Sequence, residues 1–446
     1  MVSNQRKALF LPLKIIASIM IISLLVFYFG PIPWIDKVDF AVVEASVLFV
    51  FYVVAFILGY YCRVPKRGKR VYQVKDNSKI NEEIFKLLKY TIIINLILTI
   101  ANAVIYGGVS NISQLFAKML DGLSSPDSVY YGKDASSRSG NIIVWITCFY
   151  SPIMYLTEVY ALYVFKKLSR SLQICYVATL IIEIMRWLAV GTNKGLFDIV
   201  LLLLFIFIVN RMEFHGSNIR KSVYEKRKQK KMVIIVAGIV VLFFAFFSYA
   251  ISSRINGGFH PQYFNKIPYK WLPDSIKFFS EQFDSYLTQG YANTIKIIRH
   301  CKFKWTFGMG NSRFLMDTIE RIFGISLEQR TYPYQLTSYG VDPLVSWHTA
   351  YSWFASDLTY FGVVPFMFIV GYFTSSLSRE VLLEKNPIAL TLLYFMFLAL
   401  VNASCTNYVL AFTNGFMGFW ILFIIRFIRK HNIVIRRRYV KYWDLL

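Results

Sequence analysis

The chain has 446 residues, a formal net charge of +24, 56% hydrophobic residues and only 17% charged residues, and its mean hydropathy is +0.48. A soluble protein of this length carries more charge and fewer apolar runs of about 20 residues, so the composition favours a polytopic membrane protein. The basic residues cluster in short segments between apolar runs, which favours cytoplasmic loops and anionic lipid headgroups as their environment and argues against nucleic acid.

Ten apolar segments are long enough to cross about 30 Å of hydrocarbon as helices. They lie at residues 11–30, 40–61, 90–108, 141–164, 172–190, 195–210, 232–251, 358–377, 387–402 and 407–427. We therefore expect an all-α polytopic membrane protein with about ten transmembrane helices, in which residues 1–446 form a single integral membrane domain. The 195–210 segment is short, and the glycine-bounded break before it predicts either a turn or a re-entrant unwinding.

The distribution of basic residues orients these helices. With the N-terminus inside, 31 of the 49 lysines and arginines lie in cytoplasmic segments and 16 in outer segments, 11 of the latter in one long loop. Positive charge in short loops favours the cytoplasmic side, whereas charge in a long translocated loop matters less. The apolar run after Arg6 and Lys7 has no small-residue cleavage site, which predicts an uncleaved signal anchor. We expect both termini to be cytoplasmic.

Residues 252–346 form the long loop, a polar stretch of 95 residues on the predicted outer side. Pro273 and Asp274 predict the start of a helix. Apolar residues then recur every four positions, at Phe279, Phe283, Leu287 and Tyr291. A second amphipathic segment carries Leu315, Ile319, Ile322 and Phe323. A transporter has little need of such a loop, whereas a membrane enzyme with a large substrate needs one. We expect a helical, lid-like extracytoplasmic loop.

The sequence offers no motif for a metal or a cofactor. The five cysteines form no Cys-x-x-Cys motif and no Cys/His pair, so neither a zinc site nor a disulfide framework is supported. There is no P-loop, no His-Glu-x-x-His motif, no Gly-x-Ser-x-Gly motif and no dinucleotide-binding fingerprint. An Asp-x-Asp pair, which would hold a divalent ion on a sugar nucleotide, is also missing. We therefore expect no metal and no cofactor.

Three cations near the predicted outer ends of helices are candidate site residues, because charge within a span is costly. Arg186 lies inside its span, where it either pairs with Glu183 one turn earlier or contacts substrate. Lys194 lies at the tip of the following hairpin and is either a snorkelling lysine or a site residue. Arg254 opens the long loop and is either an interfacial anchor or a site residue.

His348 is the candidate base. It stands in Ser-Trp-His-Thr-Ala-Tyr just before the span expected at 358, at the depth where a lipid-linked substrate presents its headgroup. On a continuous helix it shares a face with Ser352, whereas Asp357 points the opposite way and is a poor orienter. An imidazole is largely neutral near pH 7 and can accept a hydroxyl proton. A structural imidazole bonded to a loop carbonyl would give the same pattern, so both interpretations stay open.

The predicted topology brings Arg186, Lys194, Arg254 and His348 to the outer leaflet from three separate parts of the chain. Cations stabilise negative charge that develops on a diphosphate leaving group, and an imidazole can take a proton from a hydroxyl nucleophile. We therefore predict that His348 and Arg254 are catalytic. We also predict that Arg186, Lys194 and Arg254 bind a substrate diphosphate.

Three motifs at these residues resemble those of the polysaccharide repeat-unit polymerases, the Wzy-type family that also includes O-antigen ligases. Gly-Thr-Asn-Lys-Gly-Leu at 191–196 resembles an outer Gly-x-(Arg/Lys) turn, with one extra asparagine. Ser-Ser-Arg at 252–254 resembles the arginine that opens the large loop. Residues 347–362 resemble an Asn-x-Tyr-Thr segment that leads into an aspartate-aromatic-glycine helix start, here with Trp-His at the beginning. The expected topology resembles the family over the whole chain.

The resemblance implies a metal-independent glycosyltransferase of the bacterial cytoplasmic membrane. It would join oligosaccharide repeat units linked to polyprenyl diphosphate, such as undecaprenyl diphosphate, into O-antigen, capsule or exopolysaccharide at the outer face. The growing chain would move from its lipid carrier onto the non-reducing sugar of an incoming repeat. The implied partners are the lipid-linked oligosaccharide, membrane lipids, a chain-length regulator and a flippase.

Three alternatives remain beside this reading. An O-antigen-type ligase would transfer the glycan to a different acceptor. A lipid-linked oligosaccharide flippase belongs to another class, and it would have short outer loops and charges lining a central cavity. A glycosyltransferase that uses polyprenyl-monophosphate sugars would favour acidic residues on the first outer loop, where Asp36 and Asp39 lie.

Overall fold

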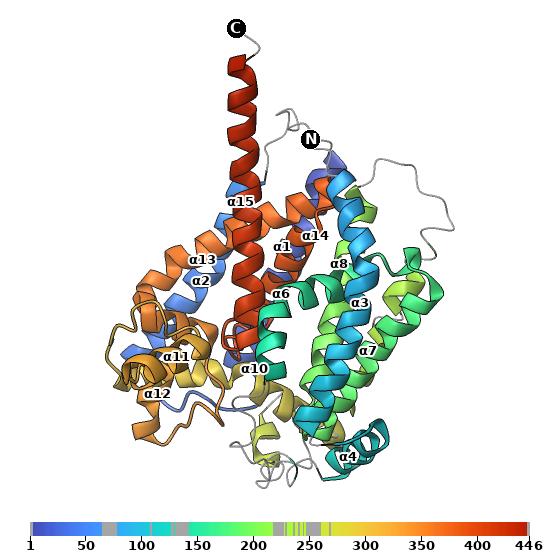
Figure 1. Cartoon of the computed structure of the whole chain (residues 1–446). Helices are drawn as coiled ribbons and strands as arrows, with labels where there is room; N and C mark the ends of the chain where they lie inside the picture. The colour runs from blue at the N-terminus through green and yellow to red at the C-terminus, as the bar shows by residue number, and fades with distance from the viewer. Residues whose placement is uncertain are drawn as a thin grey trace.

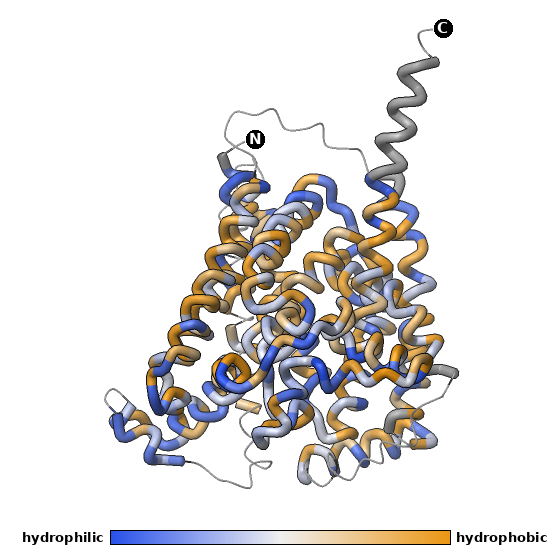
Figure 2. Tube along the Cα trace, turned by 90° about the vertical axis from the view of Figure 1, so that its left-hand side faces the viewer, coloured by the Kyte–Doolittle hydropathy of each residue, from blue (hydrophilic) through white to orange (hydrophobic). Residues whose placement is uncertain are grey.

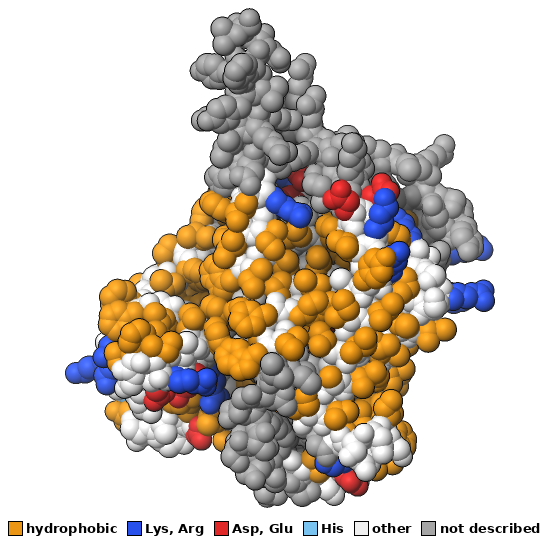
Figure 3. Space-filling view, in the orientation of Figure 1, with side chains coloured by type: hydrophobic (Ala, Val, Ile, Leu, Met, Phe, Trp, Pro, Cys, Tyr) orange, Lys and Arg blue, Asp and Glu red, His pale blue; other side chains and the backbone are white. Residues whose placement is uncertain are grey.

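The structure is a computed structural model that describes residues 3–64, 78–107, 109–125, 142–216, 260–266 and 269–443, with isolated residues at 129 and between 227 and 246. Every regular element in these ranges is a helix (Figure 1). Hydrophobic side chains cover most of the face shown in Figure 3, and charged groups gather toward its margins. The chain trace in Figure 2 shows the same division, with hydrophilic segments at the two ends of the helices. This distribution is typical of helices that cross a membrane.

Six helices in the described part of the chain are long and apolar enough to cross a membrane. They are α1 (Ser3–Phe29), α2 (Phe40–Arg63), α3 (Ser78–Gly107), α7 (Arg170–Ala189), α8 (Lys194–Gly216) and α13 (Ala350–Glu384). Three more helices overlap expected spans, namely α6 (Ile142–Tyr163), the shorter α14 (Pro387–Val401) and α15 (Thr413–Trp443). The all-helical, membrane-protein character is confirmed. In the span expected at 232–251, the residues that the structure describes, at 232–234, 237–239, 241–243 and 245–246, are helical, and the others lie outside the described residues.

The hairpin between α7 and α8 settles one open question from the sequence. α8 has 23 residues and is a full-length helix, although the expected span at 195–210 is short. The break before it is a turn. Gly191 adopts a φ of +69°, a left-handed conformation that glycine reaches without a steric penalty. A glycine in this conformation directly after a helix is a common way to end it, so the hairpin is a helix stop followed by a new helix.

Two of the expected helix starts, at 358 and 407, compare differently with the structure. α13 begins at Ala350, where the Thr349 side chain accepts a hydrogen bond from the Ser352 amide. It is broken at Thr359, whose φ of 64° and ψ of 162° are not helical, so the part of α13 after the break begins next to the expected start at 358. α15 begins at Thr413, after the expected start at 407. The segment before it is held by a tertiary contact, in which the Asn407 side chain donates to the Asn311 carbonyl at 2.8 Å.

α2 and α13 form the most extensive helix pair, and two glycines allow it. A Cβ atom on Gly59 would lie 1.9 Å from the carbonyl oxygen of Phe368, and one on Gly371 would lie 2.1 Å from the carbonyl oxygen of Phe56. The two backbones therefore touch at positions where only glycine fits. Small residues at helix contacts serve this purpose in membrane proteins, because the association depends on close packing.

The described residues between 260 and 346 contain several helices, and the helix predicted to start at Pro273 and Asp274 is present. α10 (Asp274–His300) begins directly after Pro273 and packs on α1 and α2. Its Tyr291 is buried, and its ring centroid lies 5.4 Å from that of Phe27 and 4.7 Å from that of Phe49. The buried Asp284 carboxylate accepts a hydrogen bond of 3.0 Å from the Ile32 amide. α10 is thus anchored to the first two helices by both apolar and polar contacts.

The rest of this loop consists of short helices. They are η3 (Pro261–Asn265), η4 (Tyr269–Trp271), α11 (Arg313–Phe323), η5 (Glu328–Arg330), α12 (Tyr332–Gln335) and η6 (Leu336–Tyr339). The carboxylate of Asp357 ties the segment before α11 to α13, since it accepts hydrogen bonds from the Asn311 side chain at 2.6 Å and the Gly310 amide at 3.2 Å. In Figure 1, α10, α11 and α12 lie at the end of the molecule opposite to the start of α1 and the end of α15.

Candidate functional site

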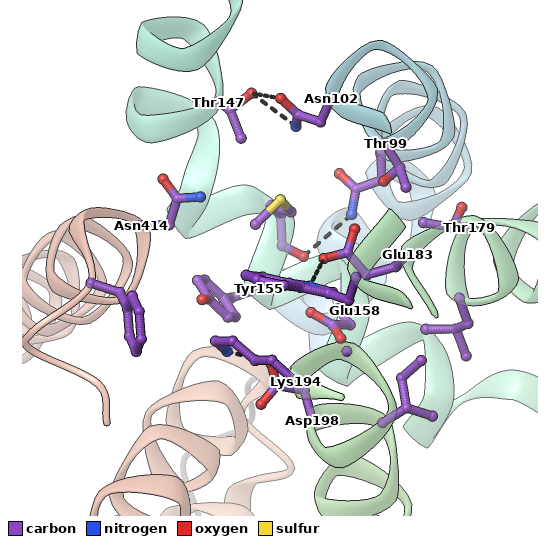
Figure 4. A pocket seen from close by; sticks show the side chains of 18 of the residues that line it. Thr99, Asn102, Thr147, Tyr155, Glu158, Thr179, Glu183, Lys194, Asp198 and Asn414 are labelled. Carbon is purple, nitrogen blue, oxygen red and sulfur yellow. Dashed lines mark hydrogen bonds and ion pairs between the residues drawn. The ribbon is translucent and has the colours of Figure 1, made fainter. Parts of the chain in front are cut away.

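A cavity of about 420 Å³ lies among α3, α6, α7, α8, α14 and the start of α15. Its lining includes six polar side chains from four of these helices: Asn102, Glu158, Glu183, Arg186, Lys194 and Asp198. The volume falls in the range of small-molecule sites. Figure 4 shows that five of them, Asn102, Glu158, Glu183, Lys194 and Asp198, converge from different helices toward one space. Charged groups are costly inside an apolar helix bundle, so this cavity is the candidate site.

The turn between α7 and α8 brings two predicted cations to the same wall of the cavity. The amide of Gly191 donates to the Leu188 carbonyl at 2.8 Å, and the amide of Thr192 donates to the Trp187 carbonyl at 3.0 Å. α8 then starts close against α7, because a Cβ atom on Gly195 would lie 2.4 Å from Cδ1 of Trp187. Tight turn geometry therefore fixes Arg186 and Lys194 near each other, as the sequence predicts.

Arg186 is held by an acidic partner on its own helix. Its Nε donates to Oε2 of Glu183 at 2.9 Å, and its terminal nitrogen donates to Oε1 of the same carboxylate. The guanidinium carbon also lies 4.3 Å from the centroid of the Trp187 ring. The indole nitrogen of Trp187 donates to Oε1 of Glu183 at 2.8 Å. The ion pair expected as the structural interpretation is present, and it faces the cavity.

Lys194 is held by contacts across the bundle. Its Nζ donates to Oδ2 of Asp198 at 2.5 Å and to the hydroxyl of Tyr408 at 3.0 Å. The Tyr408 hydroxyl in turn donates to Oδ1 of Asp198. Nζ also lies 4.5 Å from the centroid of the Tyr408 ring and 5.1 Å from that of Phe412. An ammonium has three donors, and among the described residues two of them are used, by Asp198 and Tyr408.

Glu158 is the third carboxylate of the cavity, and it lies between Glu183 and Lys194 (Figure 4). Its electrostatic neighbours are Asp198, Glu183 and Lys194. In the described part of the chain its carboxylate makes no ion pair and no side-chain hydrogen bond. The residue is partly accessible because it lines the cavity, although protein surrounds it. The cavity thus contains two paired carboxylates and one unpaired one.

Amide and hydroxyl groups complete the polar lining. The Asn102 side chain donates to the Thr147 hydroxyl at 3.2 Å, which links α3 to α6. The Asn95 side chain donates to the Met154 carbonyl at 3.3 Å and links the same two helices. Such groups both donate and accept hydrogen bonds, so they can bind a ligand rich in hydroxyls.

His348 does not line this cavity. It lies just before α13, so it is not on a helix and does not share a helical face with Ser352 as expected. The imidazole is 2% exposed, and both of its ring nitrogens lack a hydrogen-bond partner among the described residues. Burial, together with the positive charge of Lys296, lowers the pKa of His348 to about 4. This imidazole is neutral at pH 7, but it is enclosed by protein.

The segment around His348 is fixed by α10. The Trp347 amide donates to the Gln289 side chain at 3.0 Å, and the Trp347 carbonyl accepts from the Asn293 side chain at 2.8 Å. Asp357 binds the 310–311 segment, in keeping with the expectation that it does not orient His348. Arg254 lies outside the described residues, so its predicted place in the site stays a prediction.

Asp39 has a structural role. It precedes α2, accepts a hydrogen bond from the Val42 amide at 3.0 Å and pairs with Arg299 of α10 at 2.7 Å. The hydrogen bond from Val42, followed by the contact with Arg299, lowers the pKa of Asp39. This carboxylate caps a helix and ties down the long loop, which removes one reason for expecting a polyprenyl-monophosphate donor.

The sequence interpretation overlooked three residues of the cavity: Glu158, Asp198 and Tyr408. The signal for the first two is present in the sequence, because both are carboxylates within expected spans, at 141–164 and 195–210. Charge within a membrane span is costly, and this argument, which made Arg186 a candidate site residue, applies equally to these two carboxylates. Tyr408 carries no such signal, since its importance comes from its contact with Lys194.

Among the described residues, no group of three His, Cys, Asp or Glu side chains is arranged to hold a metal ion. Comparisons with family models, with curated proteins and with solved structures gave no match to this chain.

Proposed function

We propose that the protein transfers glycan chains between polyprenyl-diphosphate-linked oligosaccharides, as a repeat-unit polymerase at the outer face of a bacterial cytoplasmic membrane. The supporting observation is the charged cavity of about 420 Å³ within an apolar helix bundle, with Arg186 and Lys194 in its wall. The motifs that resemble the repeat-unit polymerases supply the reaction class. The proposed transfer uses no metal and no nucleotide cofactor.

The cavity has the lining that a sugar requires. A sugar ring presents several hydroxyls, which both donate and accept hydrogen bonds, and it has apolar C–H faces. Tyr155, Tyr394 and Tyr408 offer aromatic rings with a polar end, and Asn102 offers an amide. The aromatic rings give apolar contact area, and the polar groups select orientation. We place the reacting sugars in this cavity.

In this proposal, Lys194 binds the leaving diphosphate. Among the described residues, Asp198 and Tyr408 take two of the three ammonium donors, and a hydrogen bond from an ammonium to a phosphate oxygen is charge-assisted. Arg186 keeps its partner Glu183 and stabilises the same wall. Arg254 supplies further positive charge at the mouth of the long loop. The three cations together stabilise charge that develops on the diphosphate.

The orientation of the chain is part of the proposal. The 31-to-16 distribution of basic residues puts both termini in the cytoplasm. The start of α1 and the end of α15 lie at the same end of the molecule, as this orientation requires (Figure 1). α10, α11 and α12 would then lie on the outer side and cover a large lipid-linked substrate. A flippase and a chain-length regulator are the proposed partners.

A flippase for lipid-linked oligosaccharides is the second candidate, and one observation favours it. The cavity lies among membrane helices rather than beneath the long loop, and charges line it. An O-antigen-type ligase remains the alternative within the same chemistry.

Reconstitution distinguishes these functions. Purified protein in liposomes is given a synthetic polyprenyl-diphosphate-linked repeat, and chain length is read by gel electrophoresis and mass spectrometry. A polymerase forms multimers of the repeat from this substrate alone. A ligase forms product only when a second acceptor is added. A flippase forms no multimers and makes outer-leaflet substrate accessible inside the liposome. The absence of multimers, with translocation present, would refute the polymerase proposal.

A further inference from the structure

The main chain of Glu158 is held by two other helices, while its carboxylate is left unpaired. The Tyr176 hydroxyl of α7 donates to the Glu158 carbonyl at 2.8 Å. The Asn95 side chain of α3 donates at 3.3 Å to the carbonyl of Met154, one turn before Glu158. These contacts fix the position of the Cα atom. The fold therefore places this carboxylate in the cavity and gives it no partner among the described residues.

The two other carboxylates of the cavity are committed to cations. Glu183 binds Arg186 through both of its oxygens, and Asp198 binds Lys194 and Tyr408. A carboxylate that neutralises a cation is not available to take a proton from a substrate. Among the described cavity residues, Glu158 is the carboxylate that remains for this task.

His348 is a poor alternative on geometric grounds. A general base must come within hydrogen-bond reach of the proton that it removes, about 2.6–3.2 Å between heavy atoms. His348 is 2% exposed and does not line the cavity, so a substrate hydroxyl in the cavity does not reach it. Glu158 borders the space that the sugars would occupy.

We infer that Glu158 is the general base that activates the acceptor sugar. This inference rests on the proposed function. The Glu158 carboxylate takes the proton of the acceptor hydroxyl, and the hydroxyl oxygen forms a bond to the anomeric carbon of the donor chain. The bond between that carbon and the diphosphate oxygen breaks, and its electron pair leaves with the polyprenyl diphosphate. The proton passes from Glu158 to water when the product leaves.

Lys194 and Glu158 then have different roles. Lys194 contacts the leaving diphosphate, and Glu158 contacts the attacking hydroxyl. Figure 4 shows Glu158, Glu183 and Lys194 near one another in the cavity. A single displacement inverts the configuration of the anomeric carbon, so the linkage in the polymer is expected to be opposite to the linkage of the donor to its diphosphate.

The test compares wild type with Glu158→Gln in the reconstituted assay with a synthetic lipid-linked repeat. Glutamine keeps the size and hydrogen bonding of the side chain but cannot take the proton. Removing a general base lowers turnover by roughly 10²- to 10⁴-fold, so we expect at least about 100-fold slower chain growth with unchanged affinity for the repeat. Glu83→Gln, an exposed position on α3, is the matched control and should behave as wild type.

Glu158→Asp is the second variant, for the case in which the glutamine variant does not elute as a folded protein. It keeps the carboxylate but withdraws it by one methylene, and a displacement of about 1 Å can cost about 100-fold in rate. We therefore expect slow but measurable chain growth with unchanged affinity. Nuclear magnetic resonance of the product reports the linkage, for which inversion is expected.

Several results would overturn the inference. Wild-type turnover of Glu158→Gln or of Glu158→Asp would show that the base lies elsewhere. Loss of affinity for the repeat together with turnover would assign Glu158 to binding. Retention of configuration would exclude a single displacement. If the wild-type protein itself makes no multimers, the proposed function fails, which is distinguishable from a failure of Glu158 alone.

Discussion

Lys194, at the start of α8, donates a hydrogen bond of 3.0 Å to the hydroxyl of Tyr408, a residue 214 positions later in the chain. Both groups also bind the carboxylate of Asp198, so the three side chains form a closed polar cluster. The cluster joins the hairpin of α7 and α8 to the segment between α14 and α15. It therefore fixes one wall of the cavity and the position of the cation that we assign to the diphosphate.

The first prediction concerns Lys194. Lys194→Gln removes the charge, and losing a charge-assisted hydrogen bond costs roughly 1.5–3 kcal/mol, equivalent to roughly 10- to 150-fold in rate. We expect chain growth to slow by this factor in the reconstituted assay, and Lys194→Arg to restore it in part. Lys302→Gln, at an exposed site, is the control. Wild-type chain growth by Lys194→Gln would remove this residue from the site.

The second prediction separates the structural and functional roles of Arg186. Arg186→Met leaves the half-buried Glu183 carboxylate without its cation, with the Trp187 indole still donating to it, so the apparent Tm in detergent should fall. The double variant with Glu183→Gln removes the unpaired charge and should recover much of the Tm. We expect the double variant to remain slow in chain growth. Full recovery of both Tm and chain growth would make the ion pair purely structural.

The third prediction concerns His348 and acid. Its pKa is lowered from 6.5 to about 4, so between these pH values the unfolded chain binds more protons than the folded one. Stability therefore falls as the pH drops from about 6.5 to 4, by up to about 3 kcal/mol from this residue. His348→Gln should reduce the loss of apparent Tm between pH 7 and pH 5 and should keep chain growth.

The informative measurement is the difference between wild type and His348→Gln. Burial raises the pKa of Asp284 to about 6, which acts in the opposite direction over the same range, so only the difference between wild type and His348→Gln is informative. An equal acid sensitivity in the two proteins would contradict the account of the buried imidazole. A loss of chain growth of 100-fold or more in His348→Gln would favour the histidine as base.

The fourth prediction is the topology. In a cysteine-depleted background, Ser275→Cys at the exposed start of α10 should react with an impermeant reagent in intact cells. Glu83→Cys, exposed near the start of α3 at the opposite end of the molecule, should react only after permeabilisation. The opposite pattern of labelling would invert the proposed orientation and move the long loop inside.

The fifth prediction tests the packing of α2 on α13. Gly371→Val places a side chain where a Cβ atom already lies 2.1 Å from the Phe56 carbonyl, so the helices must separate. Overpacking costs roughly 1–3 kcal/mol or more, and we expect a lower yield of folded protein in membranes. Gly238→Val is the control, because a Cβ atom there has no atom of the described residues within 4 Å. Gly308 is unsuitable as a control because its φ of +80° would strain any other residue. Equal yields for both valine variants would disprove the contact.

The sequence predicted more of the fold than of the site. The length of the apolar segments predicts the helices, and Pro273 with Asp274 predicts where α10 starts. Both signals depend only on residues that are neighbours in the sequence. The hairpin turn gives the closeness of Arg186 and Lys194 for the same reason. The start of α15 was misplaced, because a tertiary contact at Asn407 holds the segment before it, whereas the break of α13 at Thr359 falls next to the expected start at 358.

Two properties could be predicted from the sequence alone, the all-helical membrane-protein character and the position of Arg186 and Lys194 on one hairpin. Hydrophobic length, helical periodicity and turn chemistry act over a few residues and are legible in a single chain. The tertiary structure decided which charged groups are paired. Tyr408 contacts Lys194 from 214 positions later in the chain, the Glu158 side chain has no partner among the described residues, and His348 is buried away from the cavity. The packing of helices from distant parts of the chain decides which side chains are buried and which ones form ion pairs or hydrogen bonds.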